Sequence, residues 1–455
     1  MKQNRQSLSG YDCWLLSYPV VVGISVMVFI YTMIYAPGTV LFEKPIPYVM
    51  WQQDSSTYLY ASDIIFNGSV DIFRTPVYPI VLGIMKLIAG PVYMFPLVAM
   101  FQFVVFLLSA KYLRLISLKF LNSKKLAFWT TGLYLIIPSF PTYCAIIITD
   151  SLAVSGLLFM IWFMVRNFPE KPSSIDLIYT GVTIVILILL RPIYIYLILV
   201  YIVYYTAYFA QNRNRCKLKD VMICVSVLIV VAGCVFAYRS KVHSVYGIKS
   251  ISSVTAINNY ALARFSVGVH PELAKDKELR ELLEVVQASN NKNEWYDLAI
   301  LEEYVNKYPD RFEAYTNDLI LVSPFTIAKK IYYRFMYELP GFNIFANHPI
   351  EYNGYNPYPI MYPFDLFTTI CPGFYFYWIV VLSYLAICVK NVCRARQVPI
   401  YSLLFLLLSL VHVLTAIIGA QSDYSRLTLP VAPIFLLISV KLFSLLKIKD
   451  HNEIS

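Results

Sequence analysis

Apolar runs of about 20 residues recur along almost the whole chain, and they constrain its fold more than any other feature. A helix of that length spans the hydrocarbon core of a bilayer, which is about 30 Å thick. Only 14% of the 455 residues are charged, whereas a soluble globular protein carries about 25%. Helices satisfy their backbone hydrogen bonds internally, as the bilayer interior requires. The sequence therefore predicts an all-α polytopic membrane protein.

The positions of these runs divide the chain into three predicted regions. Residues 1–239 form a transmembrane module whose polar first outer loop, 37–90, follows the first span. Residues 240–365 form a small, mainly helical insert outside the membrane, and residues 366–455 hold the last spans and a cytoplasmic tail. The ten predicted spans are 17–36, 92–114, 125–141, 148–166, 175–190, 192–210, 218–238, 366–389, 399–419 and 427–447.

The apolar stretch 76–89 lies within the first outer loop but is too short for a comfortable span. It ends at Gly90-Pro91, a dipeptide that interrupts a helix. A further span here would also move the basic cluster at 111–125 to the outer side. We therefore predict a re-entrant or interfacial helix over 76–89.

Basic residues determine the predicted orientation, because loops on the cytoplasmic side carry an excess of Lys and Arg. With the N-terminus in the cytoplasm, every loop assigned to the inside is basic. This distribution explains the net charge of +10 without a nucleic-acid partner. The residues concerned are Lys111, Arg114, Lys119, Lys124, Lys125, Arg166, Lys171, Arg213, Arg215, Lys217, Lys219, Lys390, Arg394 and Arg396.

The insert contains segments with helical periodicity. In the stretch "ELAKDKELRELLEVVQ", leucines and a valine recur at the i, i+3, i+4 and i+7 spacing of an amphipathic helix. A second helix is predicted near 293–307. A third is predicted to begin at Pro324 with Ser323 as its N-cap. The stretch 340–364, rich in Pro, Asn, Gly and Tyr, is predicted to be an ordered loop.

The segment 54–79 interrupts the apolar character of the chain with the pattern D-x3-Y-x2-A…G…R-x-P-x-Y-P. In an outer loop, this pattern resembles the GT-C superfamily of glycosyltransferases, which use polyprenyl-phosphate sugars. Within that superfamily, the pattern most resembles those of lipid A aminoarabinose transferases and of bacterial relatives of the protein mannosyltransferases. Protein mannosyltransferases usually carry an acidic pair at the loop start, whereas Ser55 follows Asp54 here.

Three further stretches extend the resemblance along the chain. "YCAIIITDSLAV" places Asp150 at the outer end of the fourth span. "LILLRPIYIYLIL" places Arg191 at the outer end of the fifth. "SDYSRLTLPVAPIFLLI" places Arg426 before the last span. The resemblance implies a GT-C-like bundle in the bacterial inner membrane, with its active site facing the periplasm.

The resemblance also implies a reaction and a set of site residues. Asp54 is expected to be the general base that takes a proton from the acceptor hydroxyl, with inversion at the sugar carbon. Arginine suits phosphate because its charged guanidinium offers forked N–H donors. The expected phosphate-binding residues are Arg191, Arg74 and Arg426, with Asp150, Tyr58 and Tyr78 in support. The expected partners are a polyprenyl-phosphate-linked sugar donor, an extracytoplasmic acceptor (glycan, lipid or protein) and membrane lipid.

Each of these residues also has a purely structural interpretation. Asp54 before Ser-Ser suits a helix N-cap, and Asp150 suits a helix N-terminus or an arginine partner. Arg191 and Arg74 can act as interfacial anchors, and Arg426 can pair with Asp423. The same interpretation, solvated or capping, is given to Asp63 and Asp71.

The sequence predicts no cofactor with confidence. His243, His270 and His348 are scattered, and no pair has the spacing of metal ligands. A divalent metal is therefore unsupported by ligand spacing. The eight cysteines show no CxxC motif and read as small apolar residues rather than a disulfide framework.

Two other kinds of protein fit the same hydropathy. An O-antigen ligase or polymerase would also combine many spans with one large outer loop, but would depend on Arg and His in that loop rather than on Asp54. A transporter would place charges at mid-membrane, often in paired repeats. Here the candidate charges lie at outer span ends, and no repeat is found.

The predicted orientation can be tested by cysteine labelling in whole cells. A cysteine at position 291 in place of Asn291 should react with an impermeant maleimide from the outside, because the insert is assigned there. Labelling that requires a permeabilised inner membrane would contradict this orientation.

Overall fold

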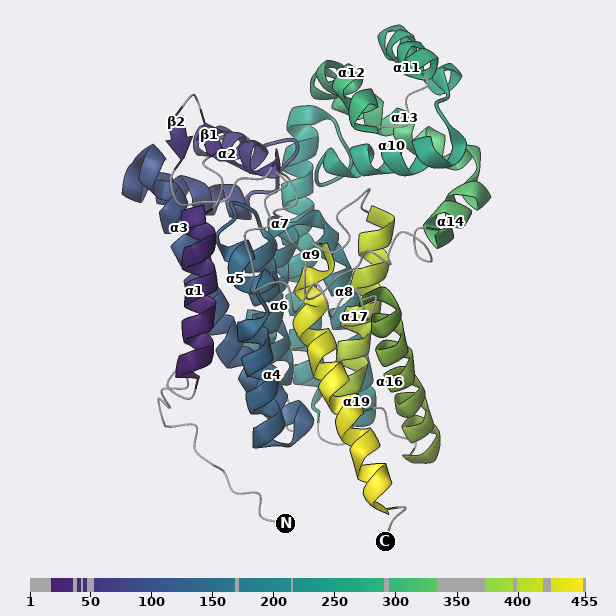
Figure 1. The fold of residues 1–455 in the computed structure, drawn as a ribbon. Helices are drawn as coiled ribbons and strands as arrows, with labels where there is room; N and C mark the ends of the chain where they lie inside the picture. The colour runs from purple at the N-terminus through teal and green to yellow at the C-terminus, as the bar shows by residue number, and fades with distance from the viewer. Residues whose placement is uncertain are drawn as a thin grey trace.

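The computed structural model describes residues 18–35, 39–41, 44–46, 53–167, 172–213, 216–289, 294–333, 373–395, 399–419 and 427–452. Long helices run along one axis, and a helical insert lies at one end of the bundle (Figure 1). The start of the first helix and the end of the last lie at the opposite end. The predicted all-α polytopic membrane fold is thus confirmed.

The bundle consists of helices that succeed one another with short connections. They are α1 (Pro19–Tyr35), α3 (Val77–Leu121), α4 (Lys124–Ile136), α5 (Ser139–Cys144), α6 (Asp150–Val165), α7 (Ser174–Leu190), η2 (Pro192–Tyr196), α8 (Leu197–Gln211), α9 (Leu218–Tyr246), α16 (Gly373–Ala395), α17 (Ile400–Gly419), η7 (Leu429–Val431) and α19 (Ala432–Asn452).

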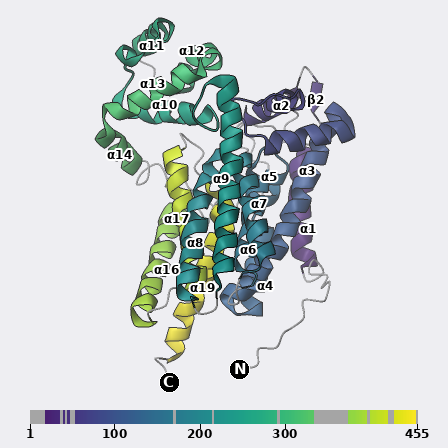
Figure 2. The ribbon, with the colours of Figure 1, turned by 180° about the vertical axis from the view of Figure 1, so that it is seen from behind.

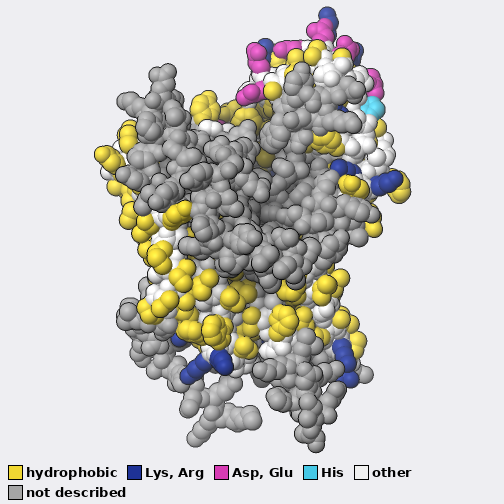
Figure 3. Space-filling model, viewed as in Figure 1, with side chains coloured by type: hydrophobic (Ala, Val, Ile, Leu, Met, Phe, Trp, Pro, Cys, Tyr) yellow, Lys and Arg dark blue, Asp and Glu magenta, His cyan; other side chains and the backbone are white. Residues whose placement is uncertain are grey.

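Length and composition identify the membrane-spanning helices. Five described helices are long and apolar enough to cross a bilayer, and four shorter apolar helices accompany them. With α4, these take the places of the ten predicted spans. Exposed apolar side chains such as Val20, Ile229 and Ile379 face outward from the bundle, and Figure 3 shows hydrophobic side chains around its lower half. The protein is therefore an integral membrane protein.

Helix α3 has two parts that meet at Gly90. There the backbone adopts φ 76° and ψ 172°, and Pro91 follows. The first part lies across the end of the bundle beside α2, whereas the second runs along the bundle axis (Figures 1 and 2). The interfacial helix predicted over 76–89 is this first part.

The first outer loop also contains α2 (Gln53–Phe66) and a two-stranded antiparallel ribbon. Strands β1 (Thr39–Leu41) and β2 (Lys44–Ile46) pair with Thr39 opposite Ile46. No strand was predicted here, because three residues are too few to show an alternating pattern. Helix α2 packs along the first part of α3, where the Phe66 ring fills the space beside Gly83.

Several predicted span boundaries differ from the structure. Helix α3 continues past 114 to Leu121, and α16 continues past 389 to Ala395. The span 125–141 is broken, since α4 ends at Ile136 and the short α5 begins after Pro138. A proline lacks the N–H that would continue the helix. The span 218–238 is too short, because α9 continues through polar residues to Tyr246 and ends at Gly247, whose φ is 75°.

The insert forms its own hydrophobic core beside that of the bundle. Its helices are α10 (Val254–Val267), η3 (Pro271–Leu273), α11 (Lys277–Ser289), α12 (Glu294–Lys307), α13 (Pro309–Val322) and α14 (Pro324–Tyr333). The helices predicted near 272–287, near 293–307 and from Pro324 are present. Helices α10 and α13 were not predicted. The predicted loop 340–364 lies outside the described residues.

The corner at Gly90 generates a test of the fold. A side chain at this φ and ψ is strained by about 1–3 kcal/mol, since the region is essentially open only to glycine. Gly90→Ala should therefore lower the thermal unfolding temperature of the purified protein. No atom outside the two neighbouring residues lies within 4 Å of the added methyl group, so the effect would come from the backbone.

Gly233→Ala is the matched control, because Gly233 is helical and also has open space beside it. Alanine favours a helix over glycine, so this variant should unfold at the wild-type temperature or above. Equal unfolding temperatures for the two variants would contradict a strained corner.

Candidate active site

Asp54 lies in the first turn of α2 and forms an ion pair with Arg74. The Nη2 atom of Arg74 is 2.8 Å from Asp54 Oδ1, and its Nε donates to Thr57 Oγ1 at 2.7 Å. The side chains of Asp54 and Arg74 are 32% and 16% exposed, so the pair is accessible to solvent. Because α2 begins at Gln53, Asp54 is inside the helix rather than at the predicted N-cap position.

Tyr58 also contacts the Arg74 guanidinium, through both its ring and its hydroxyl group. The guanidinium carbon lies 4.3 Å from the centre of the Tyr58 ring, a cation–π contact, and Nη1 lies 3.4 Å from the Tyr58 hydroxyl. Tyr78 packs edge-on against Tyr58 with ring centres 5.1 Å apart. The buried Tyr78 hydroxyl donates to Gln102, whose amide donates to the carbonyls of Cys144 and Ile146. Tyr78 therefore lies one layer beneath the ion pair.

Asp71 fixes the backbone that carries Arg74. Its buried carboxylate accepts hydrogen bonds from the backbone N–H groups of Phe73 at 2.8 Å and Arg74 at 2.5 Å. Of the two alternatives predicted for Asp71, solvated or capping, the structure shows the capping one. Burial raises the pKa of Asp71 above its usual value, and the N–H groups of Arg74 and Phe73 oppose that rise.

The insert and the end of α9 form hydrogen bonds to the same short loop, which leads to Arg74. The Ser253 N–H donates to the Ile72 carbonyl at 2.9 Å, and the Ser252 hydroxyl donates to the Phe73 carbonyl at 2.6 Å. At the end of α9, the Tyr246 hydroxyl donates to the Val70 carbonyl at 2.8 Å. The loop that presents Arg74 is thus held by residues about 180 positions further along the chain.

A second ion pair joins α6 to α7. Asp150 is the first residue of α6, and Arg191 directly follows α7. Arg191 Nη1 lies 2.7 Å from Asp150 Oδ1, and their side chains are 12% and 1% exposed. Asp150 therefore fulfils both structural roles predicted for it, at a helix N-terminus and as an arginine partner.

The two ion pairs are connected through a pair of hydroxyl groups. The Tyr58 hydroxyl lies 3.5 Å from Thr149 Oγ1, and Thr149 immediately precedes Asp150. Four elements of the chain thereby contribute to one polar group at the end of the bundle nearest the insert (Figure 1). We call it the polar cluster, and it consists of Asp54, Thr57, Tyr58, Arg74, Thr149, Asp150 and Arg191.

Tyr194 borders the polar cluster and was not predicted. Its hydroxyl is buried, has no hydrogen-bond partner within the described residues, and is subject to the charges of Arg191 and Asp150. Its ring stacks on His412 of α17, whose Nδ1 lies 2.8 Å from the Tyr196 hydroxyl. Nothing in the sequence distinguishes Tyr194 from the other 37 of its 38 tyrosines.

Other predicted site residues lie elsewhere. Arg426 and His348 fall outside the described residues. Asp63 forms an exposed ion pair with Lys86 at 2.6 Å and is not part of the polar cluster. Within the described ranges, no three His, Cys, Asp or Glu side chains gather closely enough to hold a metal ion.

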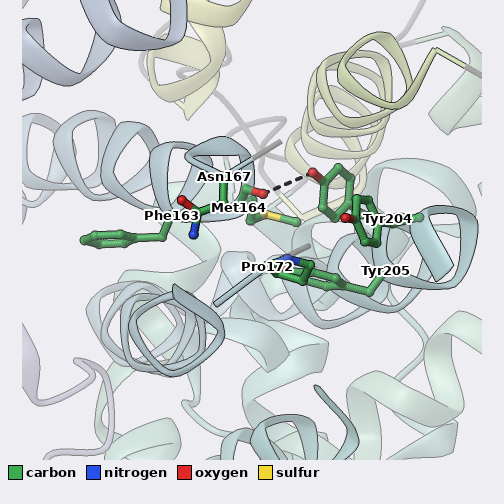
Figure 4. A pocket seen from close by; sticks show the side chains of 7 residues that line it. Phe163, Met164, Asn167, Pro172, Tyr204 and Tyr205 are labelled. Atoms are coloured by element: carbon green, nitrogen blue, oxygen red, sulfur yellow. Dashed lines mark hydrogen bonds between the residues drawn. The ribbon is translucent and has the colours of Figure 1, made fainter. Parts of the chain in front are cut away.

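A small cavity lies at the other end of the bundle, near the ends of α6 and α8 (Figure 4). At its edge, the Tyr204 hydroxyl donates to the Met164 carbonyl at 3.1 Å. Helices α6 and α8 both start at the end that bears the polar cluster, so this cavity is separated from it by most of their length. The lining residues are Phe163, Met164, Asn167, Pro172, Tyr204, Tyr205 and Tyr208.

No protein-family model matches the chain, and no curated protein matches its sequence. Solved structures do match its fold. The Archaeoglobus fulgidus oligosaccharyltransferase in complex with Zn and sulfate is 11% identical with a TM-score of 0.51, over 95% of this chain and 49% of that one. The oligosaccharyltransferase AglB from the same archaeon, in complex with an inhibitory peptide and a dolichol-phosphate, is 12% identical with a TM-score of 0.50, over 97% of this chain and 52% of that one.

The chain thus spans about half the length of these oligosaccharyltransferases. ArnT from Cupriavidus metallidurans, bound to undecaprenyl phosphate, matches at 11% identity over 95% of this chain and 78% of that one, but its TM-score of 0.38 is too low to bear on the fold. The similarity to the oligosaccharyltransferases shows the fold and agrees with the resemblance found in residues 54–79. The chain shares the fold of the part of these oligosaccharyltransferases that it matches.

Proposed function

We propose that the protein is a membrane glycosyltransferase that moves a sugar from a polyprenyl-phosphate carrier to a hydroxyl group of an extracytoplasmic acceptor. The observation that carries this proposal is the polar cluster, in which two acids and two arginines from distant segments lie at one end of a GT-C bundle. The cluster would face the periplasm of a bacterial inner membrane. The acceptor would be a glycan, a lipid or a protein.

Arg191 is proposed to bind the phosphate of the carrier lipid. It follows directly on α7, at the end of a membrane-spanning helix, where a lipid phosphate would lie. Its guanidinium carries five N–H donors, one nitrogen of which is paired with Asp150. Fixed positive charge here would stabilise the negative charge that develops on the leaving phosphate. The Tyr194 hydroxyl is a further proposed donor to the phosphate.

Arg74 and Arg426 are also proposed to bind the carrier phosphate. Arg426 is not among the residues that the structure describes. Three nitrogens of the Arg74 guanidinium contact Asp54, Thr57 and Tyr58, so these neighbours set its plane. Tyr58 and Tyr78 support this arrangement from below. Arg74 thereby contacts the proposed base directly, and its neighbour Tyr58 contacts Thr149 beside the second ion pair.

Asp54 is proposed to be the general base. Its carboxylate would accept the proton of the acceptor hydroxyl while the acceptor oxygen bonds to the anomeric carbon. The bond from that carbon to the phosphate oxygen would break, and its electron pair would leave with the carrier phosphate. Attack opposite the leaving group gives inversion. The partial exposure of Asp54 supports this role, because an acceptor must reach it.

One similar oligosaccharyltransferase was solved with zinc. In the part of this chain that the structure describes, the acids and histidines do not form a ligand set for such an ion. No step of the proposed reaction is therefore assigned to a metal.

Removing the proposed base should abolish transfer while leaving the fold intact. Asp54→Asn retains an oxygen that can accept from Arg74 but cannot take the proton, and loss of a general base costs about 10²–10⁴ in rate. The measurement follows radiolabel moving from a panel of undecaprenyl-phosphate sugars into acceptor material in membrane vesicles. Binding of undecaprenyl phosphate should remain unchanged.

Asp63→Asn is the matched control on the same helix, since Asp63 is also an ion-paired acid but lies outside the polar cluster. It should transfer sugar at close to the wild-type rate. Near-wild-type transfer by Asp54→Asn would refute the base assignment and favour the O-antigen ligase or polymerase alternative.

The phosphate site requires a paired substitution. Arg191→Ala alone would strand the buried Asp150 carboxylate, and breaking a buried pair costs about 3–5 kcal/mol of stability. In Asp150→Asn with Arg191→Gln both charges are removed together. Loss of one charge-assisted hydrogen bond, about 1.5–3 kcal/mol, should weaken undecaprenyl-phosphate binding roughly 10- to 150-fold.

Arg264→Gln with Asp297→Asn provides the control. That pair, in the insert, has a similar separation of 2.8 Å and side chains 16% and 0% exposed. Binding of undecaprenyl phosphate, measured by native mass spectrometry, should be unaffected by the control. Equal affinities for both double variants would place the phosphate away from Arg191.

A further inference from the structure

One face of α14 is apolar and exposed. Phe325 and Tyr332 are 82% and 61% exposed. With Ala328 and Lys329, which are also exposed, they stand at the i, i+3, i+4 and i+7 positions of one helical stripe. A helix that packs only against protein would bury such a stripe.

The exposed stripe continues onto the end of α13. Over the described residues from 247 to 333, the exposed large hydrophobic side chains are Val285 and five others on the end of α13 and along α14. We call these five the elbow patch. It consists of Leu321, Val322, Phe325, Tyr332 and Tyr333.

The other face of α14 places the elbow patch at the level where the insert meets the bundle. Ile327 is buried in the core of the insert. Ile331, one turn later, packs against both the insert core and the bundle core. Figures 1 and 2 agree in placing α14 at the lower edge of the insert, near the upper end of α17. The spans end at this level, so a bilayer surface would lie there.

The two ends of the insert differ in their acidic residues. Helix α14 contains Lys329 and Lys330 and no acidic residue. Exposed acids such as Glu281 and Glu284 lie on α11, and Figure 3 shows acidic side chains, mixed with some Lys and Arg, at the far tip of the insert. Aromatic side chains mixed with lysines are characteristic of helices at a membrane surface, where lysine stems extend toward lipid phosphates.

We propose that the elbow patch is a membrane contact, with its apolar side chains inserted among the lipid headgroups of the leaflet on the insert's side. The partner is the bilayer itself, because the patch is level with the span ends and α14, which carries most of it, contains lysines and no acidic residue. The contact would fasten the insert to the membrane at a second place, away from α9. This proposal does not depend on the proposed catalytic activity.

A photo-crosslinking experiment on the full-length protein tests this contact. p-Benzoylphenylalanine would be introduced at position 325 in place of Phe325, and the protein would be embedded in nanodiscs of phosphatidylethanolamine and phosphatidylglycerol. Illumination should give phospholipid adducts at position 325, identified by mass spectrometry of the peptides. The same probe at position 332 should also give lipid adducts and serves if the first variant does not fold.

Position 285 is the control, because Val285 is 55% exposed but lies on α11, away from the predicted bilayer level. It should give no lipid adduct. Absence of lipid adducts at both 325 and 332 would overturn the proposal. Adducts at those positions to a protein instead of lipid would show that the elbow patch is a protein-binding surface, which would also overturn it.

Discussion

The ion pair between Asp150 and Arg191 is the constraint on which the end of the bundle with the polar cluster depends. A carboxylate that is 1% exposed at the end of a transmembrane helix is costly unless a cation lies beside it. The pair therefore fixes the start of α6 and the end of α7 at the same level. Thr149, carried by the same turn as Asp150, then meets Tyr58 and ties the first outer loop to the bundle.

The insert contributes to this end of the molecule although none of its residues belongs to the polar cluster. Ser252 and Ser253 donate hydrogen bonds to carbonyls of the loop before Arg74. Within that loop, the Asp71 carboxylate accepts from backbone N–H groups. Glu313 of α13 in turn accepts from the backbone N–H groups of Lys249 and Ser250. Arg74 is thus positioned by contacts that run from the core of the insert to the first outer loop. Because of these contacts, a displacement of the insert would also displace the loop that carries Arg74.

The fold could be predicted from the sequence because the thickness of the bilayer determines the length of the apolar runs that span it. It predicted the corner in α3 because Gly90-Pro91 is a local signal. Site residues were named singly by family resemblance, but the pairing of Asp54 with Arg74 was not predicted. Neither were the roles of Thr149 and Tyr194, since contacts between residues far apart in the chain leave no periodic pattern. Helices α10 and α13 were missed because their packing is set by tertiary contacts.

Helix α9 has a consequence for the reach of the insert. Its 29 residues make a rod of about 43 Å, longer than the bilayer core of about 30 Å. A helix barely compresses, so the height of the insert above the membrane is set by residue count. One turn more or less would shift it by about 5 Å. The last turns of α9 therefore set how far the start of the insert stands from the membrane.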